Sequence, residues 1–454
     1  MPGKKLESGG YTLVITEKPQ AAAKIAYALG KAEKKSLGGV PYYELEREGK
    51  KIVVACAVGH IFSLASSGKG FPVFDLEWKP NYKIKKLDKT KKYYSALLSL
   101  AKKASDFIVA TDYDIEGELI GWNILRFICK QKNAKRMKFS TLTAKDLVEA
   151  YSKPLASIDF GLALSGETRH ILDWFYGINL SRALMAALKK AGKFSIISIG
   201  RVQGPALASV VKKEKEILAF KPKPYWQIYL LVSNSHRVEV KYVKDITKKV
   251  ELAKFEKLKG KTGKAETKKT EQKVPPQVPF DLTTLQVEAY RLFGITPSQL
   301  LKIAQNLYLA GFISYPRTAS QKLPPAIDYK KIIQKLSKNF SALTKHITRE
   351  TPVEGKKTDA HPAIFPTGEG ETEKLDMLEK KVYELIVKRF LACFCEDAII
   401  EQKKIVVTID NLKFTAQGMT IKKQGWLEVY KIALQEKELP ELNGTVMIKE
   451  IRIE

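Results

Sequence analysis

The chain has 454 residues, enough for roughly two to four domains, and 44% of them are hydrophobic, so it can bury sizeable cores. Lysine and arginine number 78 against 49 aspartates and glutamates, a formal net charge of +29. Enzymes of small metabolites rarely carry such an excess, so it favours a polyanionic partner, above all nucleic acid; a lysine-coated surface of the thermophile kind is the alternative.

The cysteines and apolar runs exclude several other classes of protein. The four cysteines form no CxxC pair, which argues against a zinc ribbon and a disulfide framework. No apolar run is long enough to cross a membrane, and the first ten residues lack a signal-peptide core. We therefore expect a reducing, cytoplasmic compartment and no membrane contact.

Short apolar runs alternate with helical patterns in the first third of the chain. This alternation is typical of a parallel α/β sheet, whose sites lie at the carboxyl ends of the strands. The predicted strands are 12–16, 51–62, 106–112 and 136–142, and the predicted helices are 19–30 and 117–129.

The pattern changes twice in the remainder of the chain. It is helical from 155 to 215 and strand-like over 225–273, where the lysine-rich stretch 248–273 is expected to be a solvated hairpin or loop. A proline-rich boundary at 274–281 precedes a helical region that ends near Ala392, and β patterning then returns. This order predicts one sheet domain interrupted by a helical one.

Acidic residues alternate in "VATDYDIEGE", which follows an apolar run and opens a helical pattern. Asp112 and Asp114 can point the same way from an extended segment, while Glu116 and Glu118 lie near a helix N-terminus, where negative charge is favoured. Helix capping alone is the alternative interpretation. Carboxylates this close repel one another unless a cation neutralises them, and their hard oxygen ligands suit Mg²⁺.

A second acid follows the first predicted strand, in "VITEKPQ". In a parallel sheet Glu17 and Lys18 can share a crevice with Asp112. Together the two motifs resemble the Toprim domain, the metal-binding module of topoisomerases, bacterial-type primases and some nucleases. That family usually has arginine where this chain has Ile115.

The stretch "GITPSQLLKIAQNLYLAGFISYPRT" reads as a capped helix followed by a short extended segment. Thr296 and Gln299 match a capping box, Pro297 fits the first helical position, and Gly311 fits the end. Tyr308 lies on the apolar stripe and is expected in the core.

Tyr315 lies directly after that packed element on stiff backbone, because Pro316 cannot continue a helix. A phenol is protonated at neutral pH and needs nearby cations to attack a phosphodiester. Arg317 can donate two parallel hydrogen bonds to phosphate oxygens. An ordinary surface pair is the alternative.

"SYPRT" resembles the active-site region of type IA DNA topoisomerases. Four further stretches resemble elements of that family in the family's order: "AVGH", "GETRHILDWFYGINLSRAL", "SIGRVQGPALASVV" and "DAHPAIFPT". The resemblance runs from Thr12 to about Tyr430 and is closest to the topoisomerase III and archaeal branch. Gly204 stands where the family commonly has threonine.

The resemblance implies a multidomain α/β + α + β fold, a Toprim domain joined to a toroidal type IA topoisomerase core. It places the Toprim domain at 10–152 and a helical DNA-binding domain at 153–216. A β-rich gate or hinge domain would comprise 217–280 and 397–454, and a helical domain carrying the catalytic tyrosine would comprise 281–396.

The activity that the resemblance implies is cleavage and rejoining of one strand of single-stranded DNA through a 5′-phosphotyrosyl link. Such an enzyme relaxes negative supercoils or decatenates, with Mg²⁺ and without ATP. The sequence agrees, since "GKT" at Gly260 lacks the upstream glycine of a phosphate-binding loop.

The resemblance also implies residue roles, with Glu17 as general acid or base and Lys18 and Arg317 stabilising charge on the phosphate. A structural histidine is the alternative for His361 and His60, and an ordinary helix-surface position is the alternative for Arg169, Arg201 and Gln203. His170, His236 and His346 carry no signal. The implied catalytic residues are Tyr315, Arg317, Glu17, Lys18 and His361; the implied Mg²⁺ ligands are Glu17, Asp112, Asp114 and Glu116; the implied DNA contacts are His60, Arg169, Asp173, Arg182, Ser198, Arg201 and Gln203.

The family normally continues into a C-terminal helical region with PP-x-Y-T and GIGT-x-AT elements that this sequence does not contain. A truncated chain, one half of a split enzyme and a shortened homologue stay open. The rival functions are another Toprim enzyme, a nuclease or primase, and a non-catalytic fragment that binds single strands. The expected partner is single-stranded and negatively supercoiled DNA, while a RecQ-like helicase and a missing C-terminal portion stay open as partners. The expected location is cytoplasmic and nucleoid-associated.

Overall fold

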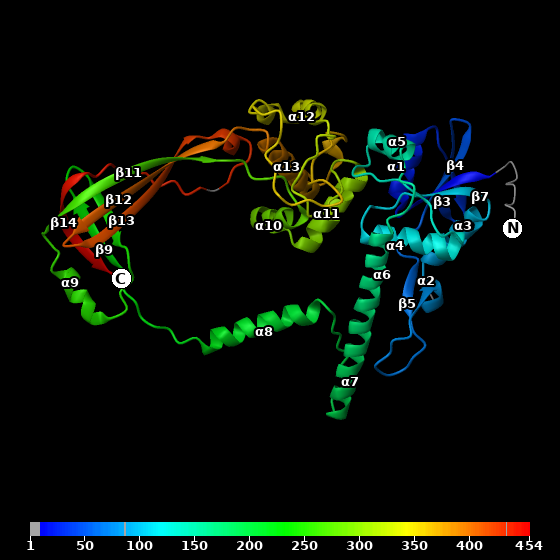
Figure 1. The fold of residues 1–454 in the computed structure, drawn as a ribbon, viewed down its shortest axis with the longest axis horizontal. Helices are drawn as coiled ribbons and strands as arrows, with labels where there is room; N and C mark the ends of the chain where they lie inside the picture. The colour runs from blue at the N-terminus through cyan, green and yellow to red at the C-terminus, as the bar shows by residue number, and fades with distance from the viewer. Residues whose placement is uncertain (1–9, 86–87, 433) are drawn as a thin grey trace. The chain divides into compact units, whose positions relative to one another are not determined.

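The computed structural model describes residues 10–85, 88–432 and 434–454 of the chain, which forms two compact units (Figure 1). The first unit comprises Met1–Lys215, Phe280–Pro324 and Lys356–Ile386, and the second comprises Glu216–Pro279, Pro325–Gly355 and Val387–Glu454. The acids and the tyrosine singled out above all belong to the first unit. The four-domain division stays a prediction.

A six-stranded sheet in the order β2-β3-β4-β1-β7-β8 forms the centre of the first unit. β1 pairs in parallel with β4 and β7, and β7 with β8, so the predicted parallel sheet is confirmed for these strands. The strand bounds are β1 Tyr11–Thr16, β2 Glu33–Leu37, β3 Val40–Arg47, β4 Lys50–Cys56, β7 Ala104–Val109 and β8 Lys135–Arg136.

Three details of this sheet differ from the predictions. The antiparallel hairpin β2–β3 was not predicted, because its residues are largely charged or polar. The predicted strand 51–62 ends at Cys56, since the backbone turns through positive φ at Val58 (φ 61°) and Gly59 (φ 87°). The predicted strand 136–142 is reduced to β8, which pairs with β7 through only two residues.

Helices flank the sheet, and the core between them contains fully buried residues such as Leu13, Val109 and Leu125. A two-stranded ribbon, β5 with β6, adjoins this core. The bounds are α1 Pro19–Leu29, α2 Asn81–Ile84, α3 Thr90–Ala101, α4 Ile115–Ile124 with a π-helical turn at Leu125–Cys129, α5 Ala144–Ser152, β5 Phe62–Ala65 and β6 Glu77–Pro80.

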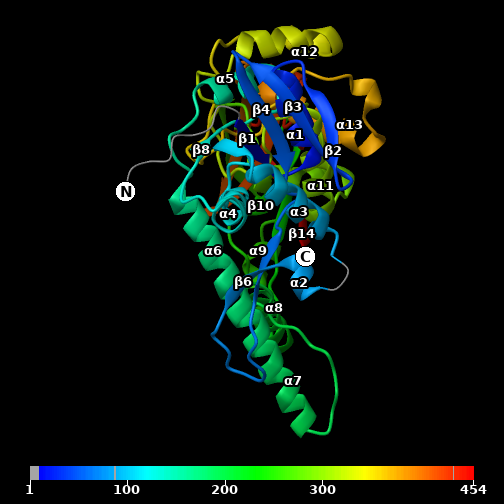
Figure 2. The ribbon, with the colours of Figure 1, turned by 90° about the vertical axis from the view of Figure 1, so that its right-hand side faces the viewer.

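A long helical rod runs away from the sheet (Figure 2). It consists of α6 (Phe160–Trp174), a π-helical stretch (Phe175–Leu180) and α7 (Ser181–Lys190), and α8 (Gln203–Ala219) follows it. α6 packs closely on α4 at Gly166, where a Cβ atom would lie 2.4 Å from the Ile115 carbonyl oxygen. Glycine therefore permits the approach that brings α6 to the acidic segment.

The segment around Tyr315 is built from α10 (Leu282–Phe293) and α11 (Pro297–Ala310). The predicted cap of α11 is confirmed: a capping box joins Thr296 and Gln299, proline occupies the first turn, and Gly311 ends the helix in the left-handed region. Two hydrogen bonds tie this segment to the Toprim-like part, from Lys24 Nζ to Ala310 O (2.7 Å) and from the Tyr315 amide to Ser140 O (2.8 Å).

The second unit contains a closed six-stranded barrel in the order β10-β13-β12-β11-β14-β9. Strands from both sides of the helical region build it, as the sequence pattern predicts. The lysine-rich stretch 248–273 was wrongly expected to be a loop or solvated hairpin, since most of it forms 3₁₀ helix, α9 and β11. The bounds are β9 Ile228–Ser233, β10 Arg237–Tyr242, α9 Ala253–Glu256, β11 Thr262–Val274, α12 Tyr329–Thr344, α13 Met377–Ala392, β12 Ala398–Ile409, β13 Leu412–Lys423 and β14 Gly444–Ile453.

Among the described residues, no helix combines the length and the apolar character that crossing a membrane requires.

Candidate active site

The acids predicted to meet at the strand ends do so. β1 and β7 are parallel neighbours, so Glu17 and Lys18 emerge beside the segment that carries Asp112. Lys18 Nζ lies 3.3 Å from Glu17 Oε1 and 3.7 Å from Asp112 Oδ2. The lysine thus stands between two carboxylates at one edge of the sheet.

The surroundings of Asp112 disfavour the charged form of its carboxyl group. Burial, followed by the negative charge of Glu17, raises the pKa of Asp112 to about 7, while Lys18 acts in the opposite direction. The Asp114 carboxylate adds to the upward shift of this pKa. A hard divalent cation among these oxygens would relieve the repulsion, so the residues fit Mg²⁺.

Asp114 joins the acidic segment to the tyrosine. Its Oδ1 accepts hydrogen bonds from the amides of Glu116 (3.1 Å) and Gly117 (2.7 Å), which caps α4. Its Oδ2 accepts a hydrogen bond of 2.6 Å from the hydroxyl of Tyr315. The predicted nucleophile and a predicted metal ligand are therefore in direct contact.

Tyr315 is buried, with 2% of its surface exposed. Its ring lies 4.7 Å from the His361 ring and 5.2 Å from the Tyr308 ring, measured between centroids. Burial, and then the charges of Asp112 and Asp114, raise the pKa of the Tyr315 hydroxyl far above its usual value. In this arrangement the phenol keeps its proton.

Arg317 contributes the nearest cation to this pair. Its Nη1 lies 4.0 Å from Asp114 Oδ2 and lowers the pKa of Tyr315 against the stronger opposing effects. The guanidinium is partly exposed, so its other donors are available to a phosphate.

Tyr308 was expected to be a core residue, and it is buried, with 1% exposed. Its hydroxyl also donates a hydrogen bond of 3.1 Å to Asp112 Oδ1, which sequence reasoning missed. No local pattern distinguishes it from an ordinary core tyrosine, because the contact joins residues far apart in the chain.

His361 is neutral and bonded on both ring nitrogens. The Tyr113 carbonyl lies 3.0 Å from Nε2, which must donate because a carbonyl oxygen only accepts. Nδ1 therefore accepts from the Ser140 hydroxyl, 3.0 Å away. Burial lowers the pKa of His361 to about 4. Donation to a scissile phosphate stays a prediction, and it requires the bond to Tyr113 to be given up.

Glu118, the last acid of the run, faces inward. It forms a fully buried ion pair with Arg136, with 2.7 Å between Oε2 and Nε. The same guanidinium donates to the backbone carbonyls of Asp112 (3.0 Å) and Met137 (2.6 Å). This pair holds the backbone of the acidic segment in place.

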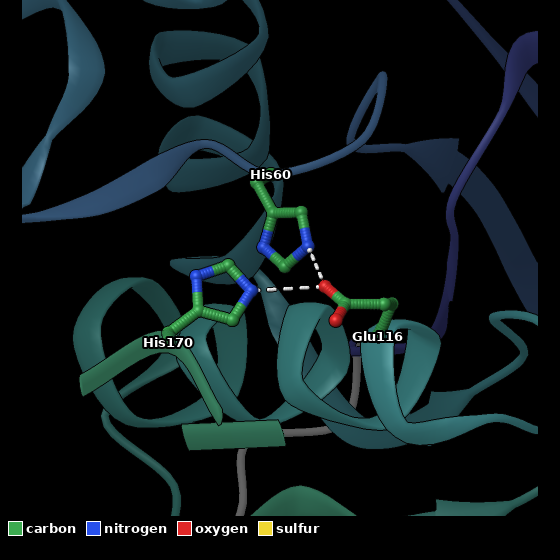
Figure 3. Close-up of side chains that lie close together, drawn as sticks. All are labelled: His60, Glu116 and His170. Carbon is green, nitrogen blue, oxygen red and sulfur yellow. Dashed lines mark hydrogen bonds and ion pairs between the residues drawn. The ribbon is translucent and has the colours of Figure 1, made fainter. Parts of the chain in front are cut away.

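Glu116 faces a separate group of side chains, which includes two histidines (Figure 3). Its Oε2 lies 2.8 Å from His60 Nε2 and 2.9 Å from His170 Nε2, and its Oε1 lies 3.3 Å from Arg169 Nη1. Hydrogen bonds from His170 and His60 hold the pKa of Glu116 far below its usual range. Sequence reasoning missed His170, whose only signal is its place beside Arg169.

Three of the predicted DNA contacts gather on α6 and the loop before α8. Asp173 accepts a hydrogen bond of 2.8 Å from Arg201 Nε and lies 3.7 Å from Arg169 Nε. An open pocket beside them is lined by Leu164, Ser165, Thr168, Arg169, Leu172 and Arg201.

The remaining predicted DNA contacts lie elsewhere. Arg182 donates to the carbonyls of Gly68 (3.3 Å) and Gly70 (2.8 Å), so it braces the loop between β5 and β6. Ser198 and Gln203 are exposed and make no contact with this cluster among the interactions of the described residues. Their roles stay predictions.

Family models match nearly the whole chain. The model described as DNA topoisomerase matches residues 157–454, and the Toprim domain model matches residues 12–142. The chain belongs to the type IA DNA topoisomerase family. Its Toprim domain is therefore the part that carries the strand-end acids, and the topoisomerase match carries Tyr315.

Two relatives and one solved structure of this topoisomerase family agree with the match. DNA topoisomerase 1 of Methanocaldococcus jannaschii is 47% identical over 96% of this chain and 59% of its own length. That of Pyrococcus horikoshii is 46% identical over 97% and 67%. Full-length topoisomerase I from Thermotoga maritima has a TM-score of 0.74 at 28% identity, over 97% of this chain and 71% of its own. The chain spans about three fifths of the first of these relatives.

Proposed function

We propose that the chain cleaves and rejoins one strand of single-stranded DNA through a 5′-phosphotyrosyl intermediate on Tyr315. The reaction relaxes negative supercoils or decatenates DNA, depends on Mg²⁺ and uses no ATP. Family membership supports the class of reaction. The observation that carries the residue assignment is the 2.6 Å hydrogen bond from the Tyr315 hydroxyl to Asp114 Oδ2, because it supplies the nucleophile with a proton acceptor.

In the cleavage step the Tyr315 oxygen forms a bond to phosphorus while the bond from phosphorus to the 3′-oxygen breaks. The phenol proton passes to Asp114, and Glu17, which enters the step in its protonated form, gives its proton to the leaving 3′-oxygen. Lys18 and Arg317 stabilise the negative charge that develops on the phosphate oxygens. Rejoining reverses these steps, so one phosphodiester replaces another and no nucleotide cofactor is required.

Glu17, Asp112 and Asp114 would hold Mg²⁺, since their burial and mutual repulsion favour a cation. When bound, the ion supplies positive charge that positions the broken DNA end for rejoining. Glu116 was also predicted as a ligand, and its engagement by His60 and His170 leaves that prediction open.

The DNA strand is proposed to follow α6, where Arg169 and Arg201 flank the open pocket. A RecQ-like helicase as partner and a cytoplasmic, nucleoid-associated location belong to the same proposal and rest on family membership alone.

A covalent trap tests the proposal. End-labelled single-stranded DNA is incubated with the chain and Mg²⁺, the reaction is stopped with denaturant, and the protein is separated on a gel. We expect a labelled protein band for the parent and none for Tyr315→Phe. Tyr308→Phe is the matched control, since it removes a neighbouring buried phenol and is expected to keep the band.

Each other outcome points elsewhere. A band that persists in Tyr315→Phe would assign the nucleophile to another residue. Metal-dependent cutting without a covalent band would favour a Toprim nuclease. DNA binding with neither cutting nor a band would favour a non-catalytic fragment.

A further inference from the structure

Two histidines and one glutamate converge from three separate elements of the first unit. His60 follows β4, Glu116 lies in the first turn of α4, and His170 lies on α6. Figure 3 shows both imidazole rings directed at the same carboxylate oxygen. One ligand atom from each residue lies within 4.8 Å of the others.

This donor set differs in kind from the acids at the strand ends. Glu17, Asp112 and Asp114 offer oxygen atoms alone, which suit Mg²⁺. Two imidazole nitrogens with one carboxylate oxygen suit borderline first-row metals, and a His₂Glu set with an open position is a common arrangement for Zn²⁺.

The distances allow an ion to replace the two hydrogen bonds. Zinc lies about 2.0–2.2 Å from imidazole nitrogen and carboxylate oxygen, so tetrahedral ligands stand roughly 3.3 Å apart. Glu116 Oε2 lies 2.8 Å from one Nε2 and 2.9 Å from the other, so each of these two distances must grow by a few tenths of an ångström, while the two Nε2 atoms, which lie within 4.8 Å of each other, must reach the same tetrahedral spacing. Rotation of surface-accessible side chains can supply these changes.

The surroundings leave one carboxylate oxygen of Glu116 to the ion and keep the site open to solvent. Arg169 lies 3.3 Å from Glu116 Oε1, which leaves Oε2 as the oxygen that faces the imidazoles. The His60, Glu116 and His170 side chains are 26%, 22% and 30% exposed, so solvent can reach the site and fill a fourth ligand position. Trp78 packs its ring on His170, with 5.8 Å between centroids, and so restricts that imidazole.

We propose that His60, Glu116 and His170 form a binding site for a first-row transition-metal ion, with Zn²⁺ as the expected occupant. The site is separate from the magnesium site of the proposed function. A bound ion would link the segment after β4 to α4 and α6. Glu116 would then be a ligand of this ion and would not be available to the magnesium site.

Cobalt absorption spectroscopy tests the proposal without DNA or turnover. The full chain is stripped of metal with a chelator, returned to excess Mg²⁺ and titrated with Co²⁺. We expect visible d–d bands that saturate at one equivalent and disappear on addition of Zn²⁺. Zn²⁺ should also raise the midpoint of thermal unfolding. Failure of this test leaves the covalent-trap result untouched, so the two proposals fail separately.

His170→Gln is the decisive variant, because glutamine can still donate a hydrogen bond to Glu116 and preserve the fold. It should weaken Zn²⁺ binding at least about 100-fold, since even changes to outer-sphere partners cost 10–100-fold. His236→Gln is the matched control, an exposed histidine in the barrel unit, and it should bind as the parent does. Asp112→Asn should also keep the cobalt spectrum.

Either of two results would overturn the proposal. No d–d bands in the parent would mean that the three residues form a hydrogen-bonded cluster only. Bands that are unchanged in His170→Gln and in His60→Gln would place the ion elsewhere.

Discussion

Two tyrosine–carboxylate pairs lie side by side at the site. Tyr315 donates to Asp114, Tyr308 donates to Asp112, and the two rings meet edge to face. Each hydroxyl satisfies one oxygen of a partly or fully buried acid, so part of the hydrogen-bonding capacity of these carboxylates is met by the neighbouring tyrosines.

His361 makes folding stability depend on pH. Burial lowers the pKa of its imidazole from 6.5 to about 4, while the charges of Asp114 and Asp359 oppose this shift and that of Lys138 adds to it. Between pH 6.5 and about pH 4 the imidazole of His361 binds a proton in the unfolded chain but not in the folded chain. The contribution is thus fully present above pH 6.5 and is lost as pH falls toward 4, by on the order of 3 kcal/mol.

Thermal unfolding at about pH 7.5 and about pH 4.5 checks this expectation. The parent should lose more stability between the two values than His361→Gln does. His346→Gln, which removes a histidine of the other unit, should retain the parent's dependence. Equal losses in all three proteins would contradict the assignment.

The buried pair of Glu118 and Arg136 predicts a large effect of a single substitution. Arg136→Met leaves the Glu118 carboxylate buried without its cation, with only the Asp159 amide still donating to it, which should destabilise the chain by about 3–5 kcal/mol. Lys135→Met is the neighbouring control, because its pair with Asp106 is about half exposed and contributes about 1 kcal/mol or less. Thermal unfolding of the two variants measures the difference, and similar midpoints would argue against this role of the pair.

The positions of the site residues that are set by neighbouring sequence could be predicted, whereas the contacts that these residues make with distant parts of the chain could not. Tyr315, Asp112 and Asp114 follow from strand ends, a helix cap and a proline, all read within a few residues. The partners of Glu116 depend on α6 packing against α4, which Gly166 permits. No pattern within α6 shows that His170 faces an acid some fifty residues away.

At the scale of elements, the C-terminal end of α11 is hydrogen-bonded by a side chain from another part of the chain, that of Lys24. Gly311 adopts φ 87°, and a Cβ atom there would lie 2.6 Å from Lys24 Nζ, which donates to the last carbonyl of the helix, that of Ala310. Gly311→Ala should therefore add the displacement of Lys24 to the cost of left-handed backbone, about 1–2 kcal/mol for the backbone alone. Thermal unfolding measures the total.

Gly294 provides the matched comparison, since it ends α10 at φ 66° and a Cβ atom there meets nothing within 4 Å. Gly294→Ala should lower the free energy of unfolding only by the cost of the left-handed backbone. When Lys24→Ala is combined with Gly311→Ala, the additional loss caused by displacing Lys24 should disappear. A double-mutant cycle detects this non-additivity. Equal effects at the two glycines would show that Lys24 does not restrain this helix end.

β11 shows why one element escaped prediction. Its burial pattern has a single buried residue, Ala265, amid lysines and glutamates, so the sequence resembles a solvated segment. The strand exists because its backbone pairs with β12 through eleven residues and with β14 through four. Strand pairing of this kind is decided by partners far along the chain, which composition does not reveal.

At the scale of the whole molecule, the net charge of +29 predicts binding that weakens steeply with salt. For single strands the logarithm of the binding constant should fall with that of salt by about 0.7 per neutralised phosphate. Arg201→Gln should reduce this slope by about one such contact, and Arg237→Gln, at an exposed position in β10 of the barrel, should leave it unchanged. Fluorescence anisotropy over a salt series measures both. If Arg201→Gln has the same salt dependence as the parent, Arg201 does not contact the DNA backbone.

The helical segment is inserted between two strands of the barrel, so force on that segment enters the barrel through these two strands. The chain leaves from the end of β11 and returns at the start of β12, where Val274 pairs with Ala398. A pull along the axis of this two-stranded stem loads the hydrogen bonds of β11 to β14 and of β12 to β13 in shear, so they must break together. A pull that separates β11 from β12 breaks their residue pairs one after another. By this strand pairing, the stem should resist a pull along its axis more strongly than a sideways one.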